Sequence, residues 1–452
     1  MKKILLLGAG LSTINLIKYL LDNSEQYDWT LRIGDQSLDL AKKKIGTHPR
    51  CTYFNFDVTN QDQLFKEISQ SDIVISMLPV RFHHHVAAVS VELGKNMVTA
   101  SYVSDEIKAM NEAAKQKGII ILMEIGVDPG IDHMSAMKII DEIKMRGGKI
   151  NLFKSFTGGL IAPKHDNNPW NYKFTWNPRN VVLAGQGVSK FIRNGKYKYI
   201  PYNRVFTRTE RVFFDEVGEF EAYANRDSLK YREIYGLKNI PTMFRGTLRR
   251  PGFCKSWNIF VQLGMTDDSY QLEEMDKMSY RDFTNSFFSY NRTMSLEEKM
   301  ARLFNLSEDS SILYKMRWLG LFSDEKIGLK RATPAQVLLH LLKKKWALDD
   351  NDKDMIVMKH LFEYSINDKR EQIESSLVVY GNDHTAMSIT VGTPLAIAVK
   401  HILLGNFTCT GVQIPIKKEI YEPILEELKE YGIRFNEKKI EEKDFKELHS
   451  TL

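Results

Sequence analysis

Hydrophobic and polar positions along residues 1–128 alternate between short apolar runs and longer amphipathic segments. The apolar runs span about four or five residues and predict strands, whereas the segments between them place apolar residues at helical spacing. Strands that alternate with helices predict a parallel sheet with right-handed crossovers, here a Rossmann-type doubly wound α/β domain. The predicted strands are Lys3–Leu7, Leu31–Gly34, Thr52–Asn55, Ile73–Ser76, Asn96–Thr99 and Ile119–Leu122, and the predicted helices are Leu11–Leu21, Leu38–Lys44, Gln61–Ile68, His83–Leu93 and Asp105–Lys117.

The pattern changes from Lys149 onward, where strand-like stretches alternate with turns rich in proline and asparagine. These stretches are Lys149–Thr157, Val212–Phe214, Phe220–Ala224, Met243–Thr247 and Trp257–Leu263, followed by a helical region over 265–364, strands at Ser375–Tyr380 and Thr385–Val391, and amphipathic helices at Pro394–Leu404 and Tyr421–Tyr431. The predicted division is a dinucleotide-binding domain (1–128), a mixed α+β substrate domain (129–264 with return strands in 371–392), a helical subdomain (265–370) and C-terminal helices (393–452). Those last helices are candidates for packing back on the first domain.

Composition adds little to this picture. The chain has 452 residues, of which 43% are apolar and 27% charged, and a formal net charge of +6. Lysine and arginine are spread along the chain, which favours solubility and attraction for an anionic cofactor and substrate over nucleic-acid binding. The chain has no run of about 18 apolar residues, so no membrane span is predicted. The three cysteines, Cys51, Cys254 and Cys409, lie far apart, so neither zinc nor a disulfide framework is predicted, and a cytoplasmic location is expected.

A glycine turn follows the first predicted strand and opens the first predicted helix. Gly8 permits the tight turn, and Gly10 lets backbone amides approach a pyrophosphate at the positive helix end, with Leu11 and Ser12 as neighbouring cofactor contacts. The third fingerprint position, normally glycine or alanine, is Thr13. The pattern therefore predicts a dinucleotide site, and the alternative is a glycine turn that binds no nucleotide.

An acidic side chain, Asp35, ends the second predicted strand about 25 residues after this turn. A carboxylate there accepts hydrogen bonds from a ribose 2′-OH and repels a 2′-phosphate, so NAD is predicted to be preferred over NADP. Arg32 lies inside the strand and is less well placed to offset the repulsion.

Two later strand ends belong to the same predicted cleft. Asp57 and Val58 follow the third strand, and Leu78 and Pro79 follow the fourth, where the cofactor is expected to lie against the backbone. Asp57 has an alternative role as the N-cap of the helix at Gln61–Ile68.

The segment Glu124–His133 joins the sixth predicted strand to a helical pattern at Met134–Ile143. Its Pro129-Gly130 pair forces a turn, which delivers Asp128 to the carboxyl edge of the sheet, where the reacting end of a cofactor is expected. The alternative is an ordinary loop in which Asp128 and Asp132 cap the helix.

The run His83-His84-His85 has the composition of a metal-binding tract. Consecutive residues on a helix point in different directions, so these three cannot all ligate one ion. No metal site is predicted, and one of the three is a candidate for facing the cleft.

Several stretches occur in a characteristic order: Glu124–His133, Gly158–Leu160 with Ala162-Pro163, Asn168-Pro169 with Tyr172–Trp176, Asn225–Ser228, Arg245–Arg249 with Pro251–Phe253, and Gly392–Pro394. In these motifs, over nearly its whole length, the chain resembles the glutamate-forming saccharopine dehydrogenases, also called saccharopine reductases. The resemblance implies oxidative cleavage of saccharopine, with NAD(P) and water, to L-glutamate and 2-aminoadipate 6-semialdehyde. It also implies the reverse imine reduction, a place in lysine metabolism and a homodimer.

The resemblance further implies contacts to both ligands. Saccharopine carries three carboxylates, which the planar fork of arginine grips well. Without the resemblance, structural ion pairs would be the alternative for the two arginines, and Lys173 is a second candidate for a carboxylate. The implied substrate contacts are Ser101, Tyr102, Asp128, Arg226, Thr247, Leu248 and Arg249, and the implied nicotinamide-side contacts are Val127, Asp128, Pro129 and, in the cleft, Trp176.

Two departures from the family pattern concern residues near the implied substrate site. Thr157 stands where relatives often have a cysteine, so a proton-shuttle role of that thiol is not expected here. Leu160-Ile161-Ala162-Pro163 lacks the first proline of the usual Leu-Pro-Ala-Pro.

Asp128 is the predicted catalytic residue. It would either accept a proton from the substrate amine, which requires a raised pKa, or orient the amine electrostatically. Two other functions are alternatives. A polyamine-forming dehydrogenase of the carboxynorspermidine or homospermidine synthase type would need acidic pockets, which Arg226 and Arg249 oppose, and a silent dinucleotide-sensing scaffold would not need these residues intact.

Overall fold

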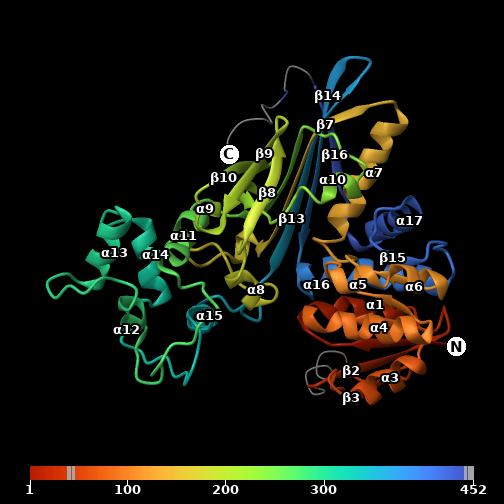
Figure 1. The fold of residues 1–452 in the computed structure, drawn as a ribbon, viewed down its shortest axis with the longest axis horizontal. Helices are drawn as coiled ribbons and strands as arrows, with labels where there is room; N and C mark the ends of the chain where they lie inside the picture. Colours follow the sequence, from red (N-terminus) through yellow and green to blue (C-terminus); the bar gives the residue numbers. More distant parts are fainter. Residues whose placement is uncertain (38–41, 43–45, 442–444, 446–452) are drawn as a thin grey trace. The chain divides into compact units, whose positions relative to one another are not determined.

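The computed structural model describes residues 1–37, 42, 46–441 and 445 (Figure 1). The chain divides into two compact units. Unit 1 comprises Met1–Ile150, Tyr364–Glu371 and Ser375–Lys439, and unit 2 comprises chiefly Asn151–Glu363 and Gln372–Glu374.

Unit 1 contains a seven-stranded sheet in the order β15-β6-β5-β4-β1-β2-β3, and its neighbouring strands run parallel. The order reverses between β1 and β4, and ligands of doubly wound sheets bind at the carboxyl ends of the strands that flank such a point. The predicted Rossmann-type fold is confirmed. The strands are β1 (Lys2–Leu7), β2 (Trp29–Asp35), β3 (Cys51–Asn55), β4 (Ile73–Ser76), β5 (Asn96–Val98), β6 (Ile120–Leu122) and β15 (Gly411–Gln413).

Helices connect these strands and cover the sheet (Figure 1). Of the predicted helix at Leu38–Lys44, only Lys42 is among the described residues, and the helix predicted at Asp105–Lys117 is divided at Met110. The helices of unit 1 are η1 (Leu11–Thr13), α1 (Ile14–Asp22), α3 (Gln61–Ser69), η2 (Val80–Phe82), α4 (His83–Leu93), α5 (Asp105–Ala109), α6 (Asn111–Gln116), α7 (Ile131–Met145), α16 (Ala386–Leu403), α17 (Lys418–Leu428) and η4 (Lys429–Tyr431).

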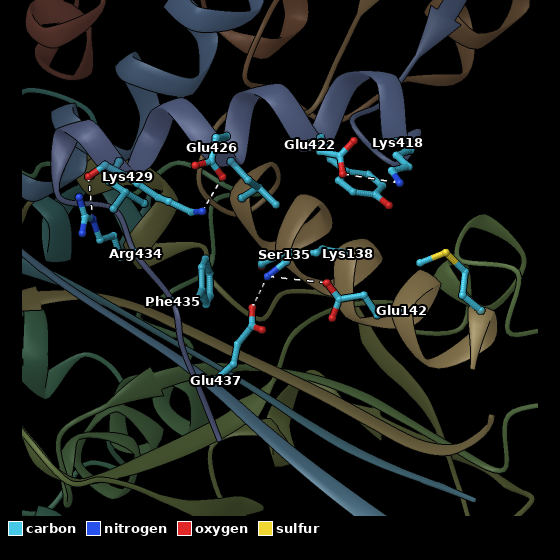
Figure 2. Close-up of a pocket in the computed structure, with 14 residues that line it drawn as sticks. Ser135, Lys138, Glu142, Lys418, Glu422, Glu426, Lys429, Arg434, Phe435 and Glu437 are labelled. Carbon is cyan, nitrogen blue, oxygen red and sulfur yellow. Dashed lines mark hydrogen bonds and ion pairs between the residues drawn. The ribbon is translucent and has the colours of Figure 1, made fainter. Parts of the chain in front are cut away.

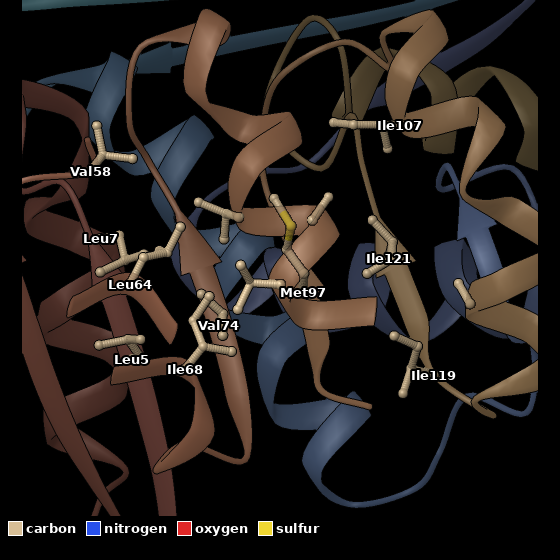
Figure 3. Packing of buried hydrophobic residues seen from close by; sticks show 14 of the residues in the cluster. Leu5, Leu7, Val58, Leu64, Ile68, Val74, Met97, Ile107, Ile119 and Ile121 are labelled. Carbon is tan, nitrogen blue, oxygen red and sulfur yellow. The ribbon is translucent and has the colours of Figure 1, made fainter. Parts of the chain in front are cut away.

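One face of this sheet buries a core cluster that includes Leu5, Leu7, Val74, Met97 and Ile121 (Figure 3). These residues are 0–1% exposed, and burying such side chains contributes roughly 1.5–3 kcal/mol each. The central strands are buried on both faces, so their residues form continuous apolar runs, which is why the sequence pattern predicted them well.

Helix α16 packs against α1 at a close contact through Gly392. A Cβ atom on Gly392 would lie 2.7 Å from the backbone nitrogen of Leu16, and the Asn15 N–H donates to Ser388 Oγ at 3.2 Å. By length and composition, this 18-residue helix is apolar enough to cross a membrane, but 72% of it is buried inside the protein. A buried core helix meets the same criterion, and its contact with α1 fits that account.

Unit 2 is built on the larger part of a nine-stranded mixed sheet in the order β10-β11-β12-β7-β13-β14-β16, with β8 pairing β12 and β9. β12 runs parallel to β7 and antiparallel to β11. The ends of β13 and β14 and most of β16 are grouped with unit 1. The strands are β7 (Lys149–Ile161), β8 (Val188–Arg193), β9 (Lys196–Pro201), β10 (Thr209–Phe214), β11 (Gly218–Ala224), β12 (Thr242–Arg249), β13 (Asp354–Ile366), β14 (Lys369–Tyr380) and β16 (Asn436–Ile440).

The helical part of unit 2 is anchored by buried aromatic rings. Trp170 stacks on Phe260 with ring centroids 5.7 Å apart, and meets Trp257 and Trp346 edge-on. The mixed α+β unit and its helical part, both predicted, are therefore present. The helices are η3 (Pro163–His165), α8 (Pro178–Val182), α9 (Tyr202–Val205), α10 (Tyr231–Ile234), α11 (Phe253–Leu263), α12 (Tyr280–Asn285), α13 (Leu296–Phe304), α14 (Ser311–Leu319) and α15 (Pro334–Lys345).

Three predicted elements are wrong. Trp257–Leu263 was predicted as a strand but forms most of α11, and Thr385–Val391 begins α16, with the Thr385 side chain accepting the Ser388 N–H as its N-cap. Residues 354–364, assigned to the helical region, lie in strand β13. In each case burial and packing overrode the local preference of β-branched, aromatic or polar residues.

Candidate active site

The glycine turn lies at the carboxyl end of β1. Gly8 has φ +93°, and a Cβ atom there would lie 2.7 Å from the Met77 carbonyl oxygen, so both conformation and space require glycine. A Cβ on Gly10 would meet nothing within 4 Å. The backbone amides of Gly10, Leu11 and Ser12 donate to no acceptor in the described part of the chain. Together they offer free N–H groups at the start of the η1–α1 helical segment, which fits a pyrophosphate.

The Asp35 carboxylate lies directly against this turn. Its Oδ2 accepts the Ala9 N–H at 2.7 Å and its Oδ1 accepts the Ser37 N–H at 2.8 Å. Arg32 does not compensate this charge, because its guanidinium forms two hydrogen bonds to Glu67, at 2.5 and 2.8 Å, and lies over the Phe54 ring.

The remaining predicted cofactor residues also lie at strand ends of unit 1. Leu78 is half-buried and Pro79 is exposed just after β4, while Val58 is in the core cluster, so a contact there would use its backbone. Asp57 is exposed and its Oδ1 accepts from the backbone and side chain of Thr59. The N-cap of α3 is Asn60, so the alternative that Asp57 caps this helix is wrong.

Asp128 lies in a tight loop after β6. The Gly126 N–H donates to the Pro129 carbonyl at 2.9 Å, and a Cβ on Gly130 would lie 2.1 Å from the Gly126 oxygen. Asp128 is half-buried between its buried neighbours Val127 and Pro129, and its Oδ1 accepts the Tyr102 hydroxyl at 3.3 Å.

The alternative that Asp128 and Asp132 cap helix α7 is not what the structure shows. The N-cap residue is Gly130, with no side-chain cap, and Asp132 in the first turn accepts the Gly130 N–H at 2.7 Å.

Glu124 connects this loop to the segment that carries Ser101 and Tyr102. Glu124 is buried with φ +57°, its N–H donates to the Ser101 carbonyl at 3.0 Å, and its Oε1 accepts the Val103 N–H at 3.1 Å. Its Oε2 lies 2.8 Å from Nε2 of the buried His133. This pairing role was not recognised in the sequence, although both residues stand in the predicted motif.

His83, at the start of α4, is a second residue whose role the sequence did not show. It is 2% exposed, and its Nδ1 lies 2.8 Å from Ser76 Oγ while its Nε2 lies 2.7 Å from Ser101 Oγ. Burial, with a smaller contribution from His84, lowers the pKa of His83 to about 4. Over the described residues, no group of three or more His, Cys, Asp or Glu side chains is arranged to hold a metal ion.

In unit 2, Arg249 is a buried cation without a counter-ion. It is 3% exposed at the end of β12, and its guanidinium lies 4.9 Å from the centre of the Tyr172 ring and 5.3 Å from that of Phe253. One nitrogen donates to the Leu248 carbonyl at 2.8 Å, whereas Nε has no partner. No carboxylate among the described residues pairs with Arg249, so within that part of the chain it does not form the structural ion pair of the alternative.

Two threonines lie near Arg249 in the sheet. Thr247 is on the same strand, β12, and Thr157 is on the neighbouring strand β7. Thr247 is half-buried and stands in register with Tyr223 of β11 and with Thr157 of β7. The Thr157 hydroxyl is buried and has no hydrogen-bond partner among the described residues. The Leu248 side chain is fully buried, so only its backbone would reach a substrate.

Arg226 follows β11 in a left-handed conformation, with φ +47°. It is exposed, its carbonyl accepts the Lys190 N–H at 2.8 Å, and it forms no ion pair with a described residue. It lines a pocket of about 430 Å³ with Asn180, Gln186, Lys190 and others. A strained, exposed arginine at a pocket is typical of a functional position.

Two other predicted residues lie in the same unit. Trp176 is half-buried just before α8. Lys173, the second candidate for a substrate carboxylate, is buried with its ammonium group 2.8 Å from Asp349 and 2.6 Å from Asp352. That candidate is wrong, because two internal carboxylates already neutralise the charge.

A groove of about 310 Å³ in unit 1, between α7 and α17, contains none of the predicted site residues (Figure 2). Its charges pair with one another: Lys138 with Glu437 and Glu142, Lys418 with Glu422, and Lys429 with Glu426. This internal pairing gives no preference for a charged ligand.

The parallel sheet, the glycine turn with free amides and the acidic residue beside it define a dinucleotide-binding oxidoreductase fold joined to a second, mixed unit. The family model described as "Saccharopine dehydrogenase NADP binding domain" matches residues 4–122, and the model "Saccharopine dehydrogenase C-terminal domain" matches residues 126–433. The chain therefore belongs to the saccharopine dehydrogenase family.

Individual relatives agree with this assignment. The chain is 34% identical to "Saccharopine dehydrogenase [NADP(+), L-glutamate-forming]" of Pyricularia oryzae, over 97% of this chain and 99% of that one. It is 36% identical to "Alpha-aminoadipic semialdehyde synthase, mitochondrial" of Rattus norvegicus, over 96% of this chain but 47% of that longer protein. A solved structure of the apo, L-Glu-forming saccharopine dehydrogenase from Saccharomyces cerevisiae superposes with a TM-score of 0.87 at 32% identity, covering 98% of this chain and 100% of that one.

Proposed function

We propose that this protein oxidises saccharopine with NAD(P) and water to L-glutamate and 2-aminoadipate 6-semialdehyde, a reaction of lysine metabolism that runs in reverse as an imine reduction. The observation that carries the proposal is Arg249, a buried guanidinium that lacks a carboxylate partner in the described chain. A buried charge without a partner is costly, and a substrate carboxylate would neutralise it. Family membership identifies which carboxylate-bearing substrate fits.

Saccharopine has three carboxylates and a secondary amine. In this proposal Arg249 and Arg226 grip carboxylates, and the hydroxyls of Thr247 and Ser101 donate to their oxygens. The aromatic rings around Arg249 exclude water, which strengthens its interaction with an anion.

The glycine turn would hold the dinucleotide through the amides of Gly10, Leu11 and Ser12, with Leu78 and Pro79 alongside. When bound, the oxidised nicotinamide supplies the hydride acceptor. Asp128 would face the substrate amine and either take its proton or fix its orientation. The Tyr102 hydroxyl, which donates to Asp128 Oδ1 at 3.3 Å, holds the Asp128 carboxylate in place.

We further propose that Asp35 makes this chain prefer NAD over NADP. Its carboxylate lies against the glycine turn, and Arg32 is committed to Glu67, so no cation from β2 offsets the repulsion of a 2′-phosphate. The relative from Pyricularia oryzae carries NADP(+) in its name, and the matching family model is described as NADP-binding.

The cofactor proposal is tested by comparing kcat/KM for NAD and NADP in the wild type and in Asp35→Ser. Removing the charge is expected to raise the relative use of NADP about tenfold, since one nearby like charge costs on the order of 1–2 kcal/mol. A wild type that strongly prefers NADP would contradict the role given to Asp35.

The reaction itself is tested by absorbance of the reduced cofactor, with saccharopine in one direction and L-glutamate plus 2-aminoadipate 6-semialdehyde in the other. Turnover in both directions is expected. Polyamine-type substrates serve as the comparison, and turnover of these without turnover of saccharopine would reject the proposal in favour of a polyamine-forming dehydrogenase. A chain that binds a dinucleotide but turns over neither substrate would be a sensor or scaffold.

We also propose a cytoplasmic homodimer that binds neither a membrane nor nucleic acid. The three cysteines are free, which fits a reducing compartment, and the apolar helix α16 is packed within unit 1. Sedimentation equilibrium and cell fractionation test this, and a monomer or a membrane-associated fraction would contradict it.

A further inference from the structure

His83 connects two serines that lie at the ends of neighbouring strands. Ser76 ends β4, Ser101 follows β5, and these two strands pair in parallel from Ile73 opposite Asn96 to Ile75 opposite Val98. The 3₁₀ turn η2 after Pro79 brings His83 back over the sheet edge as the first residue of α4. Both ring nitrogens are within 2.8 Å of a serine hydroxyl.

The neutral state of this imidazole limits what the arrangement can do. Burial disfavours the charged form, so the ring carries a single N–H, and one nitrogen donates while the other accepts. The hydrogen bonds can therefore run in only two directions. In the inward direction, the Ser101 hydroxyl donates to Nε2 of His83, so the Ser101 oxygen can only accept a hydrogen bond from a ligand. Running outward, Ser76 donates to Nδ1, Nε2–H donates to Ser101, and the Ser101 O–H is left for a ligand.

We propose that His83 is a positioning residue that holds Ser101 as a hydrogen-bond donor to a substrate carboxylate, through the outward chain from Ser76 to His83 to Ser101. The inference rests on the proposed function, because it takes Ser101 to be a contact to an acidic substrate. A carboxylate has no hydrogen to give, so only the outward direction satisfies both the ligand and the chain. An amide or ammonium group in the same place would instead favour the inward direction.

The arrangement thus contributes to specificity. Ser101 is held at its oxygen by Nε2 and at its backbone by Glu124, whose N–H donates to the Ser101 carbonyl at 3.0 Å. A hydroxyl fixed in this way loses little rotational freedom when it donates to an anion. His83 therefore acts on binding through Ser101, without contact to the substrate itself.

Two substitutions separate this role from simple packing. His83→Leu fills the space but removes both hydrogen bonds, whereas His83→Gln retains an amide N–H that can take the place of Nε2–H. His83→Leu is expected to raise KM for saccharopine about tenfold with a smaller change in kcat, the amount expected for one hydrogen bond to a charged group. His83→Gln is expected to restore most of the affinity. His85→Gln, on the neighbouring half-exposed histidine outside the chain of hydrogen bonds, is the matched control and is expected to leave KM unchanged.

If His83→Leu does not fold, Ser76→Ala replaces it, since it removes the first donor and leaves His83 and Ser101 in place. Its KM is expected to rise about threefold, because Nδ1 loses the hydroxyl donor that favours the outward direction. An unchanged KM in both His83→Leu and Ser76→Ala would overturn the inference.

Nuclear magnetic resonance of ¹⁵N-labelled histidine in the full chain gives an independent reading. In the saccharopine complex, His83 is expected in the Nε2–H form, with an unprotonated Nδ1. A dominant Nδ1–H form in the complex would overturn the inference even if KM changed. If the wild type turns over saccharopine but the expected KM and tautomer results are not found, only the inference about His83 is rejected. If the wild type does not turn over saccharopine, both the proposed function and the inference are rejected.

Discussion

Polar groups are treated differently in the two units of this protein. In unit 1 the charged and polar side chains near the sheet edge find partners within the protein: Asp35 binds the Ala9 amide, Glu124 pairs with His133, and His83 lies between two serines. In unit 2 the buried Arg249 meets a carbonyl and aromatic rings, and its Nε has no hydrogen-bond partner among the described residues.

The difference concerns how the polar groups of each unit affect the stability of the ligand-free protein. A polar network whose members are all paired fixes one geometry, which suits a site that must present backbone amides in a set order. A buried charge left for a ligand lowers the stability of the free protein and strengthens binding when the ligand arrives. The paired network at the sheet edge of unit 1 is therefore in place before binding, whereas the surroundings of Arg249 in unit 2 are completed by it.

The largest effect is expected for Arg249→Met. The substitution removes a buried charge and fills the same space, so kcat/KM for saccharopine should fall about 100-fold or more, while the free energy of unfolding should not fall. Steady-state kinetics and urea unfolding of the ligand-free protein measure the two quantities.

Arg250→Met is the matched control for that prediction. Arg250 donates to the Val217 carbonyl at 2.7 Å and lies over the Phe220 ring, so its loss should cost about 1 kcal/mol of stability and leave KM unchanged. Arg249→Met with unaltered KM, or with a marked loss of stability, would remove the contrast between the units.

A smaller effect is expected for Asp128→Asn, which keeps the shape of the loop and the acceptor for Tyr102. If Asp128 receives or steers the amine proton, kcat should fall about 100-fold with little change in KM, because the contribution lies in the reaction step. The pH profile of kcat measures it. The same kcat as the wild type at every pH would end this assignment.

Lys173→Met tests whether a buried, paired cation of unit 2 contributes to the stability of the protein and not to substrate binding. The substitution leaves the buried Asp352 without its cation, so the free energy of unfolding should fall by about 2 kcal/mol while KM for saccharopine stays constant. Thermal unfolding measures the loss of stability, and steady-state kinetics measure KM. A large rise in KM with unaltered stability would return Lys173 to the substrate site.

The smallest effect concerns Glu427, which links α17 to α1 and α16 through Tyr19 and Lys400. Burial opposes its ionisation, but the nearby His401 ring, 3.7 Å away, and hydrogen bonds from Lys400 and Tyr19 more than offset this and lower its pKa to about 2. A folded pKa below the unfolded value stabilises the protein above about pH 4.5, and this contribution is lost as the pH falls toward 2.

Glu427→Gln should therefore cost about 1 kcal/mol at pH 7 and nothing near pH 2. Urea unfolding of both proteins across this range measures the difference. A gap between the two proteins that stays constant with pH would show that the ion pair does not account for it.

The amino-acid sequence predicted the unit 1 sheet almost strand by strand, because its strands are buried on both faces and read as short apolar runs. It also placed the glycine turn and the Asp128 loop, where backbone geometry demands particular residues, as the 2.7 Å approach of Met77 to a Cβ on Gly8 demonstrates. It misassigned Thr385–Val391, since these residues favour strands locally while their helix is stabilised by contacts with α1.

By itself, the sequence determined the fold class, the dinucleotide turn and the family motifs, because these depend on local periodicity and on residues next to one another in the chain. Only the tertiary structure decided which charges are free to act. The sequence offers both Lys173 and Arg249 as candidates for a substrate carboxylate, with Lys173 second. Among the described residues, Lys173 meets Asp349 and Asp352 from about 180 residues away, whereas Arg249 meets a carbonyl and aromatic rings. The partners of a buried charge come from distant segments, so their presence or absence is a property of the packed chain.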